Sequence, residues 1–331
     1  MLATLRNIFS PAAIVKTLTA LPPMATTIMD SYFKNRPTHP LPMLGLADLQ
    51  QVAQTVPLVR RDGTPVSLAG ESFEAQFIAP LPVKVKVNVS ASELNDLRAL
   101  LEQPQAVEAW RQNKIEHIRM TSRNTTEAIC SVVLNLGKVS WPVQLEGGRN
   151  EVYEVDYGPV QSYTPAATLT AASSLSALFN LLQGMAQKIQ ESGLGGRVEF
   201  LAGADVASVL MDIVNASMTT TGSHPYRLEL SEGKIMVGAF VIRFMYEKYP
   251  SPTGAAWVDK LASQTLLAVA ADQPGTVYYC AIDSISAKNA AVPMHIVPVA
   301  RDDDSGITLI GQTKPLPVRP SRAACKCIAV N

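Results

Sequence analysis

Residues 105–136 read QAVEAWRQNKIEHIRMTSRNTTEAICSVVLNL and contain neither glycine nor proline before Gly137. This uninterrupted stretch, closed by a glycine, predicts one helix of about 48 Å at ~1.5 Å per residue. Its apolar side chains gather toward the two ends, whereas the central TSRNTTE (121–127) is polar. We therefore expect the helix to lie across a surface rather than through a core.

Strands and amphipathic helices are expected after this helix. The segments KVSWPVQL (138–145) and NEVYEVDYG (150–158) flank Gly147 and Gly148, which favour a tight reversal. Further along, the hydrophobic pattern predicts a helix over 173–193, a strand over 196–203, a helix over 204–217 and strands over 234–247, 264–271 and 276–282. Elements in this order indicate a compact α+β unit from about 168 to 285.

The N-terminal region is expected to form an arm. Ser10 followed by Pro11 predicts the start of a short helix, with the serine as its N-cap. Six prolines stand between residues 22 and 57, and this composition favours extended chain over helix.

A β-hairpin is predicted at VPLVRRDGTPVSL (56–68), because Asp62 and Gly63 between two apolar runs favour a tight turn. The strand that follows alternates Lys84 and Lys86 with valines, and the prolines just before them exclude it from the middle of a sheet. An isolated hairpin is marginal in water. No segment next to it in the sequence offers a matching apolar sheet, so we expect the hairpin to have no partner in its own chain.

Composition sets the class of protein. The 331 residues are 47% apolar, enough for two cores, and 28 Lys and Arg balance 28 Asp and Glu, which argues against a polybasic nucleic-acid-binding surface. No apolar run approaches the ~20 residues that span a bilayer. Four cysteines form no disulfide framework and indicate a reducing cytosol. Cys325 and Cys327 share one face of a predicted strand, and with no further ligand nearby they are expected to be core residues.

Motifs of catalysis are missing from the sequence. The four histidines are scattered along the chain: His39, His117, His224 and His295. GLGG at 193–196 follows a helix instead of opening one, so it is a helix stop and not a phosphate-binding loop. RDDDSG at 301–306 fits a solvated turn. We therefore expect no catalytic residue, no cofactor and no metal.

Three stretches together carry a resemblance to a known family: VSWPVQLEGGRNEVYEVDYG (139–158), EFLAGADVASVL (199–210) and GQTKPLPVRPSRAACKCIAV (311–330). With the arm, the hairpin, the long helix and the α+β unit in this order, the chain resembles the lambda-like major capsid protein E family of tailed bacteriophages, which has the Hong Kong 97-type fold. The resemblance spans nearly the whole chain. SQTLLAVAADQPG (263–275) departs from the family pattern, which leaves the fold expectation unchanged.

The resemblance implies an α+β chain with a defined order of parts. These are an N-terminal arm (1–55), an extended hairpin loop (56–90), a peripheral domain (91–167) with its spine helix (105–136), an apical domain (168–290) and a return to the peripheral domain (291–331). The hairpin would then lie over a neighbouring subunit. The residues expected to make this contact are Arg60, Arg61, Asp62, Gly63, Lys84 and Lys86.

The implied function is that of a major head protein, not an enzyme. Hexamers and pentamers would form an icosahedral shell around double-stranded DNA of a tailed phage or prophage. The protein would assemble in the host bacterial cytoplasm and reside in the virion capsid. Expected partners are other copies of the chain, a separate scaffolding protein, a portal and the packaged DNA, contacted non-specifically on the inner face; a decoration protein is compatible, and no membrane is expected.

Two alternatives stay open at this point. An encapsulin-like compartment has the same fold and would contain an enzyme in place of genomic DNA. A small-molecule enzyme with a site in the apical domain would form a small oligomer with a ligand-filled cleft.

If residues 56–90 act between subunits, the turn at Asp62 and Gly63 sets the register and reach of the ribbon without supporting the monomer's core. Deleting residues 60–65, or the change Gly63→Val, which opposes a positive φ, is expected to leave thermal unfolding of the unassembled chain nearly unchanged and to abolish closed shells. Unfolding and particle yield are measured side by side. A loss of roughly 1–3 kcal/mol in the unassembled chain would place the hairpin in an intramolecular sheet instead.

Overall fold

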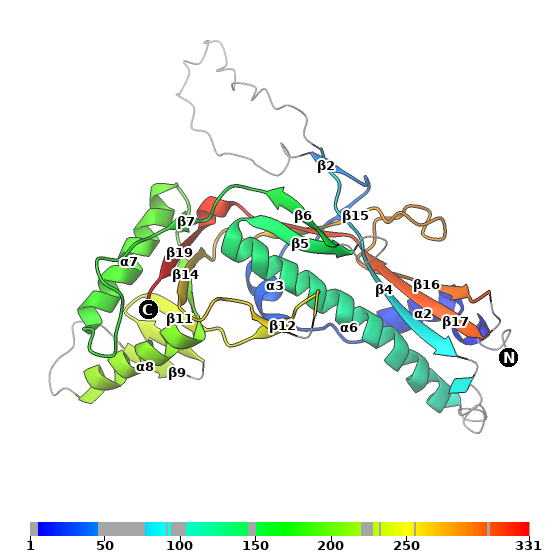
Figure 1. The fold of residues 1–331 in the computed structure, drawn as a ribbon, viewed down its shortest axis with the longest axis horizontal. Coiled ribbons are helices and arrows are strands. Elements are labelled where there is room, and N and C mark those ends of the chain that lie inside the picture. The colour runs from blue at the N-terminus through cyan, green and yellow to red at the C-terminus, as the bar shows by residue number, and fades with distance from the viewer. Residues whose placement is uncertain are drawn as a thin grey trace, which may run out of the picture.

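The computed structural model describes residues 6–45, 77–90, 92–93, 104–144, 150–219, 228–231, 233–254, 256–302 and 305–330. The molecule is elongated (Figure 1), with a helix-covered sheet at one end and the long helix α6 running toward the other end, where the N-terminal helix lies. Arg60, Arg61, Asp62 and Gly63 lie outside the described residues.

Helix α6 spans Pro104–Leu136 and confirms the predicted spine helix. It ends at Gly137, which has a φ of +72°, and a Cβ at this position would lie 2.2 Å from the backbone oxygen of Gly158. The chain then reverses through β5 (Lys138–Gln144) and β6 (Asn150–Asp156), which pair antiparallel as predicted.

The arm is partly helical, which corrects the expectation of extended chain. Helix α2 (Pro11–Ala20) begins as predicted, with Ser10 Oγ accepting a hydrogen bond from the Ala13 amide at 3.4 Å. A second helix, α3 (Thr27–Tyr32), occupies a proline-free part of the arm. Its first free amides find their acceptor on α6, far away in the sequence, and local composition therefore could not indicate it.

Beyond α3 the arm forms short pairings. Strand β1 (Thr38–His39) pairs parallel with β15 (Thr276–Cys280), which also pairs with β18 (Pro315–Val318). Strand β2 (Leu44–Gly45) pairs with β3 (Phe77–Ile78). The arm is thus held by backbone hydrogen bonds as well as by its helices.

Strand β4 (Val83–Ser90) has a partner in its own chain, contrary to expectation. It pairs antiparallel with β17 (Gly306–Thr313), and β16 (His295–Ala300) completes the sheet in the order β16-β17-β4. The partner was missed because Lys86 and Ile310, which face each other in the register, are far apart in the sequence. The prolines were interpreted correctly, since β4 lies at an edge of this sheet.

A seven-stranded sheet forms the other end of the molecule, in the order β7-β19-β14-β8-β11-β10-β9. Its strands are β7 (Gln161–Ser162), β8 (Val198–Ala202), β9 (Leu228–Ser231), β10 (Lys234–Val237), β11 (Phe240–Phe244), β14 (Thr265–Ala270) and β19 (Ala324–Ile328). The last strand, β19, belongs to this sheet and not with β16 and β17. The 3-10 turn η2 (Ser321–Ala323) precedes it.

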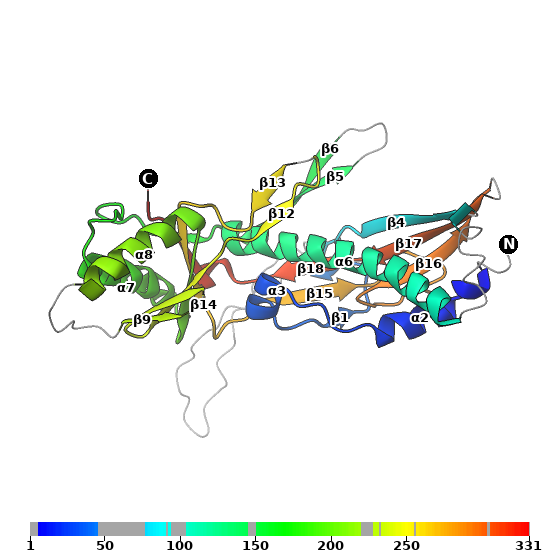
Figure 2. The same cartoon turned by 90° about the horizontal axis from the view of Figure 1, so that it is seen from below.

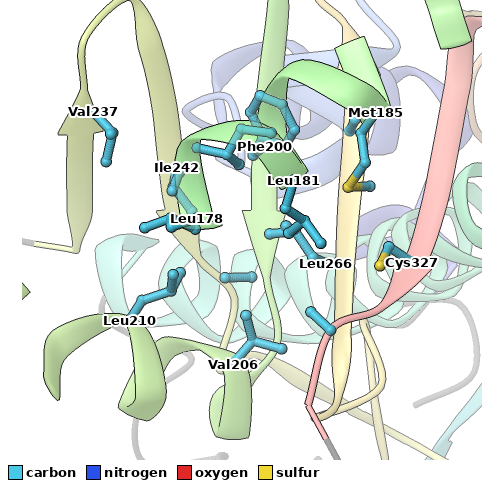
Figure 3. Packing of buried hydrophobic residues seen from close by; sticks show 14 of the residues in the cluster. Leu178, Leu181, Met185, Phe200, Val206, Leu210, Val237, Ile242, Leu266 and Cys327 are labelled. Atoms are coloured by element: carbon cyan, nitrogen blue, oxygen red, sulfur yellow. The ribbon is translucent and has the colours of Figure 1, made fainter. Parts of the chain in front are cut away.

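The central strands β8 and β14 of the seven-stranded sheet are buried on both faces. Helices α7 (Leu175–Glu191) and α8 (Ala204–Thr219) pack on one face, where Leu178, Phe200 and Val206 meet (Figure 3). Leu201 and Leu267, which point the other way, pack in a second cluster with α3 and α6. This two-sided burial explains the continuous apolar run of β14.

The remaining ribbon is β12 (Lys248–Pro250) with β13 (Trp257–Asp259). It stands out on the same side of the molecule as β5 and β6 (Figure 2), and the rings of Trp141 and Tyr249 join the two ribbons with centroids 5.9 Å apart. Within the described ranges, no helix has the length and apolar character needed to cross a membrane.

One face of the polar middle of α6 is buried, which corrects the expectation that this helix lies across a surface. Ser122, Thr126 and Glu127 are each no more than 3% exposed. Glu127 can occupy such a position because two amides of the arm donate to its carboxylate, and Thr126 Oγ1 donates to the Ser122 carbonyl within the helix.

The two helix-terminal glycines Gly137 and Gly193 allow a matched test of the α6 turn. Both have positive φ, but a Cβ at Gly193 would meet no atom within 4 Å. Gly193→Ala is expected to cost about 1 kcal/mol from backbone strain alone, and Gly137→Ala several times more because of the added clash with Gly158. Urea unfolding of both variants measures the difference. Equal losses would show that the close approach at Gly137 is unimportant.

Candidate functional site

The histidines, cysteines and carboxylates of the described residues form no metal centre. In the parts of the chain that the structure describes, no group of three or more His, Cys, Asp or Glu side chains could hold a metal ion. His295 Nε2 lies 3.1 Å from Ser286 Oγ near the surface. The imidazole ring of His295 is partly buried, and this burial lowers its pKa. Asp283 forms an ion pair with Lys314, whose Nζ lies 3.0 Å from Asp283 Oδ2. His224 lies outside the described residues.

Cys325 and Cys327 are core residues, as the sequence predicted. Both lie on β19 in the cluster under α7, and both are at most 1% exposed. Burial raises the pKa of Cys325 to about 12 and that of Cys327 to about 11, so both stay neutral thiols at physiological pH.

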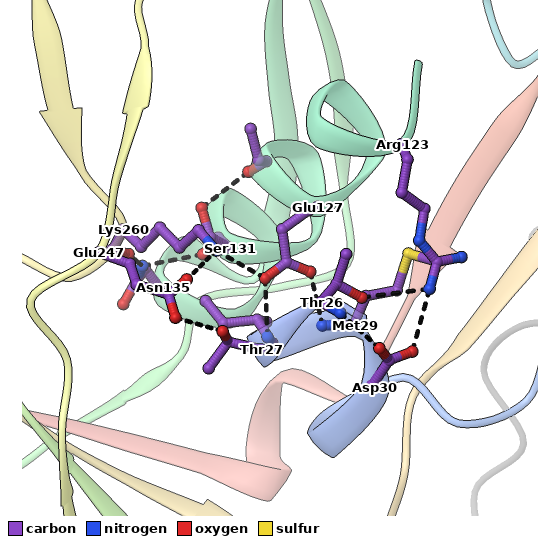
Figure 4. Close-up of polar contacts among 12 residues, drawn as sticks. Thr26, Thr27, Met29, Asp30, Arg123, Glu127, Ser131, Asn135, Glu247 and Lys260 are labelled. Carbon is purple, nitrogen blue, oxygen red and sulfur yellow. Dashed lines mark hydrogen bonds and ion pairs between the residues drawn. The ribbon is translucent and has the colours of Figure 1, made fainter. Parts of the chain in front are cut away.

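Glu127 joins the spine helix to the arm (Figure 4). Its Oε1 accepts a hydrogen bond from the Ile28 amide and its Oε2 one from the Met29 amide, each at 2.7 Å. These amides belong to the first turn of α3, where backbone donors have no partner within the helix and a negative charge is favourable. The carboxylate therefore caps α3 from another element.

Lys260 follows β13 and completes the same junction. Its ammonium donates to Glu127 Oε1 at 2.8 Å and forms an ion pair with Glu247. Burial alone would lower the pKa of Lys260, but the hydrogen bonds and charges of the two carboxylates raise it above its ordinary value. Thr27 Oγ1 also donates to Glu247, so the arm, α6 and the β12–β13 ribbon meet around one ion-pair network.

A second polar cluster lies one turn away on α6. Arg123 donates to Thr26 Oγ1 at 3.2 Å and to Asp30 Oδ1 at 3.0 Å, and Arg36 pairs with the same carboxylate. Burial raises the pKa of Asp30, yet the bonds from Arg36 and Thr26 hold it below its ordinary value. Sequence reasoning missed both clusters. The only local signal was a set of charged residues inside the polar middle of a long helix.

Strand β4 presents the predicted lysines to the outside. Lys84 and Lys86 are exposed, while Val85 and Val87 pack toward α6 and Val89 is fully buried beside Ile115. The outer edge of β4 pairs with no other described strand. A strand edge with exposed lysines can contact another chain without inviting indiscriminate edge pairing. The contact of Lys84 and Lys86 with a neighbour stays a prediction.

Apolar side chains are exposed on the protruding ribbons. Trp257 on β13 is 67% exposed, and Val258 and Val152 are also open to solvent. Large apolar groups displayed on projecting strands are suited to contacts with other protein chains. The arrangement as a whole offers contact surfaces and a rigidly held arm.

Comparison with known proteins identifies relatives of this architecture. The family model described as phage major capsid protein E matches residues 10–330. A protein described as a prophage capsid protein, from E. coli CFT073, is 13% identical over 97% of this chain and 99% of its own, with a TM-score of 0.63.

Two other solved structures are more distant. A phage-related protein of Bordetella bronchiseptica RB50 is 11% identical over 96% of this chain and 95% of its own, with a TM-score of 0.46. The SrpI encapsulin of Synechococcus elongatus PCC 7942 is 13% identical over 86% and 94%, with a TM-score of 0.42. No curated protein matches the chain.

The Glu127 junction is expected to be important for stability. Glu127→Gln removes the charge opposite a buried lysine and weakens the cap of α3, which should cost roughly 2–4 kcal/mol in the free energy of unfolding. Glu116→Gln, on the same helix, is the control and should change it by less than about 0.5 kcal/mol. Chemical denaturation measures both. A loss below ~1 kcal/mol for Glu127→Gln would contradict the assigned role.

Glu247 should make the junction sensitive to acid. Burial raises its pKa, but hydrogen bonds from Lys260 and Thr27 bring it below the ordinary value of 4.5. A depressed carboxyl pKa stabilises the fold above the unfolded value, and this contribution is lost as the pH falls through the folded value. The difference in the free energy of unfolding between the natural chain and Glu247→Gln should thus be largest near pH 7 and should shrink as the pH falls below about 4.5. Unfolding measured across this range would contradict the assignment if the difference stayed constant.

Proposed function

Because the chain belongs to the phage major capsid protein E family, it is a shell-forming capsid protein, and we propose that hexamers and pentamers of it enclose double-stranded DNA in an icosahedral shell. The family match over residues 10–330 carries this proposal. The α+β fold is of the Hong Kong 97 type, in keeping with the TM-score of 0.63 to the E. coli CFT073 protein. The expected family and fold class are thus confirmed.

The proposed domain boundaries follow the helices and strands of the structure. We assign residues 1–55 to an arm, 56–90 to an extended loop, 91–167 to a peripheral domain with the spine helix, 168–290 to an apical domain and 291–331 to a return segment. The seven-stranded sheet with α7 and α8 supports the apical assignment, and the pairing of β17 with β4 supports a return to the peripheral side. The last strand of the chain, β19, pairs with β14 and so joins the seven-stranded sheet of the proposed apical domain.

The proposed contact between subunits uses the extended loop. Its tip would carry Arg60, Arg61, Asp62 and Gly63 to a neighbour, and the base of the ribbon would present Lys84 and Lys86. Support comes from the base: β4 is anchored on α6 and β17, with both lysines exposed. A ribbon held at its base by its own subunit is positioned to project toward another.

Partners beyond the shell are part of the proposal. Oligomeric assembly into a capsid follows from the family, and the virion is the place of the protein. We further propose a separate scaffolding protein, a portal, non-specific contact with DNA on the inner face, and assembly in the host cytoplasm. A decoration protein fits the same scheme. The role is structural, and we propose no catalytic activity.

Electron microscopy of the purified protein tests the proposal. Negative-stained samples should contain closed, uniform particles, and particles from infected or induced cells should contain DNA. A monodisperse small oligomer would contradict shell formation and favour the enzyme alternative. Closed particles that contain one enzyme and no DNA would favour an encapsulin-like compartment.

Charge reversal on β4 tests the contact. The double change Lys84→Glu and Lys86→Glu alters exposed side chains, so thermal unfolding of the unassembled chain should stay within about 1 °C. Particle yield should fall by roughly tenfold or more, because repulsion recurs at every copy of the contact. Lys234→Glu, which alters an exposed side chain on β10, is the control and should assemble normally. Normal yield from the double variant would contradict a role of these lysines between subunits.

A further inference from the structure

A cavity of about 500 Å³ lies between the arm, the spine helix and the strands β15 and β17. The arm contributes Met24, Asp30 and Arg36, and the helix contributes Ser122 and Arg123. Thr313 closes it from β17. The cavity thus joins three parts of the chain that are distant in sequence, and none of the functions assigned above uses it.

Positive charge dominates the lining. Three guanidinium groups, those of Arg36, Arg119 and Arg123, face a single carboxylate, that of Asp30. Both oxygens of this carboxylate are already occupied: Oδ1 accepts from Arg36 and Arg123, and Oδ2 accepts from the Thr26 amide at 2.6 Å. The cavity therefore has an excess of cationic groups that the protein itself does not neutralise.

Hydrogen-bond donors in the lining have no partner among the described residues. Four buried atoms share this property: Nε of Arg36, Nε of Arg123, Oγ of Ser122 and Oγ1 of Thr313. Ser122 is 3% and Thr313 2% exposed, so neither hydroxyl can rely on bulk water. Each of the four groups can donate a hydrogen bond. Their gathering in one cavity is unusual, because buried polar groups are normally paired.

The bonds already made by the arginines hold them in place. Arg123 donates to the Met24 carbonyl at 3.3 Å, and Arg36 donates to the Met29 carbonyl at the same distance. Arg119 donates to the Pro22 carbonyl. Because these bonds use terminal nitrogens, the Nε groups of Arg36 and Arg123 have no hydrogen-bond partner among the described residues. Both Nε atoms are buried, so a ligand would reach them after a small shift of the two side chains.

We propose that this cavity binds a phosphate-sized oxyanion. Its oxygens would accept hydrogen bonds from the two Nε groups and from the hydroxyls of Ser122 and Thr313, with the excess positive charge balancing its own. Charge-assisted bonds from guanidinium groups to phosphate are among the stronger polar contacts in proteins. Met24, Pro293 and Met294 add apolar walls to the same cavity.

Bound there, the anion connects the arm to the spine helix and to β17. The arm would be held by one more set of contacts, in addition to the Glu127 junction. Occupancy of the cavity would therefore regulate how firmly the arm is attached to the rest of the subunit.

Inorganic phosphate is the probe for the test. Thermal unfolding of the full chain is followed as phosphate increases at constant ionic strength, with chloride as the balancing salt. Saturation at about ten times Kd should raise the midpoint by roughly 2–4 °C. Equilibrium dialysis with labelled phosphate should show about one site per chain.

The variants separate binding from folding. Ser122→Ala and Thr313→Val remove hydroxyls with no partner among the described residues, so without phosphate the midpoint should be unchanged or higher. Their combination should abolish the shift caused by phosphate, and Arg119→Gln should weaken it. Lys34→Gln removes an exposed charge from the same arm but not from the cavity, and should preserve the shift.

An absent shift together with no bound phosphate would overturn the proposal, and so would a shift that the double hydroxyl variant retains. A short single-stranded oligonucleotide added in excess shows whether the bound phosphate group comes from nucleic acid or from the free anion. Displacement of labelled phosphate would show that nucleic-acid phosphates reach the site, and retention would show that it takes the free anion. Neither result depends on particle formation.

Discussion

The buried carboxylate of Glu127 is the constraint on which the rest of the structure depends. A charge that is 3% exposed must be neutralised and fully hydrogen-bonded, and no neighbour on α6 does this. The first turn of α3 and the ammonium of Lys260 do it instead. Meeting this requirement brings together the arm, helix α6 and the β12–β13 ribbon.

Apolar packing connects the same elements to both ends of the molecule. The seven-stranded sheet packs α7 and α8 on one side, while its other side joins the cluster that contains α3 and the end of α6. At the far end of α6, the valines of β4 and residues of β17 pack on Ile115 and Ile118. One long helix therefore contacts both ends of the subunit, which allows the arm and the ribbons to be held rigidly relative to each other.

This rigidity has meaning for a shell protein. Subunits in a shell meet through projecting segments, and a projecting segment positions a neighbour only if its base is fixed. Strand β4 is fixed by backbone pairing to β17, and the arm by an ion pair to α6. The arginine-lined cavity beside the second ion-pair cluster lies where a small anion would add to that fixation.

The sequence by itself determined the elements with strong local signals: the glycine-free spine helix and its stop at Gly137, the β5–β6 reversal, the α7 and α8 helices and the edge position of β4. The order of these elements also led to the family. Only the tertiary structure decided that β4 pairs with β17, that α3 is helical, and that one face of the polar middle of α6 is buried. In each case the deciding partner lies far away along the chain, as with Glu127 and Met29 or Lys86 and Ile310. Periodicity, capping and turn signals report only on neighbours in sequence, whereas a buried charge or an edge strand is stabilised by whatever the fold brings to it.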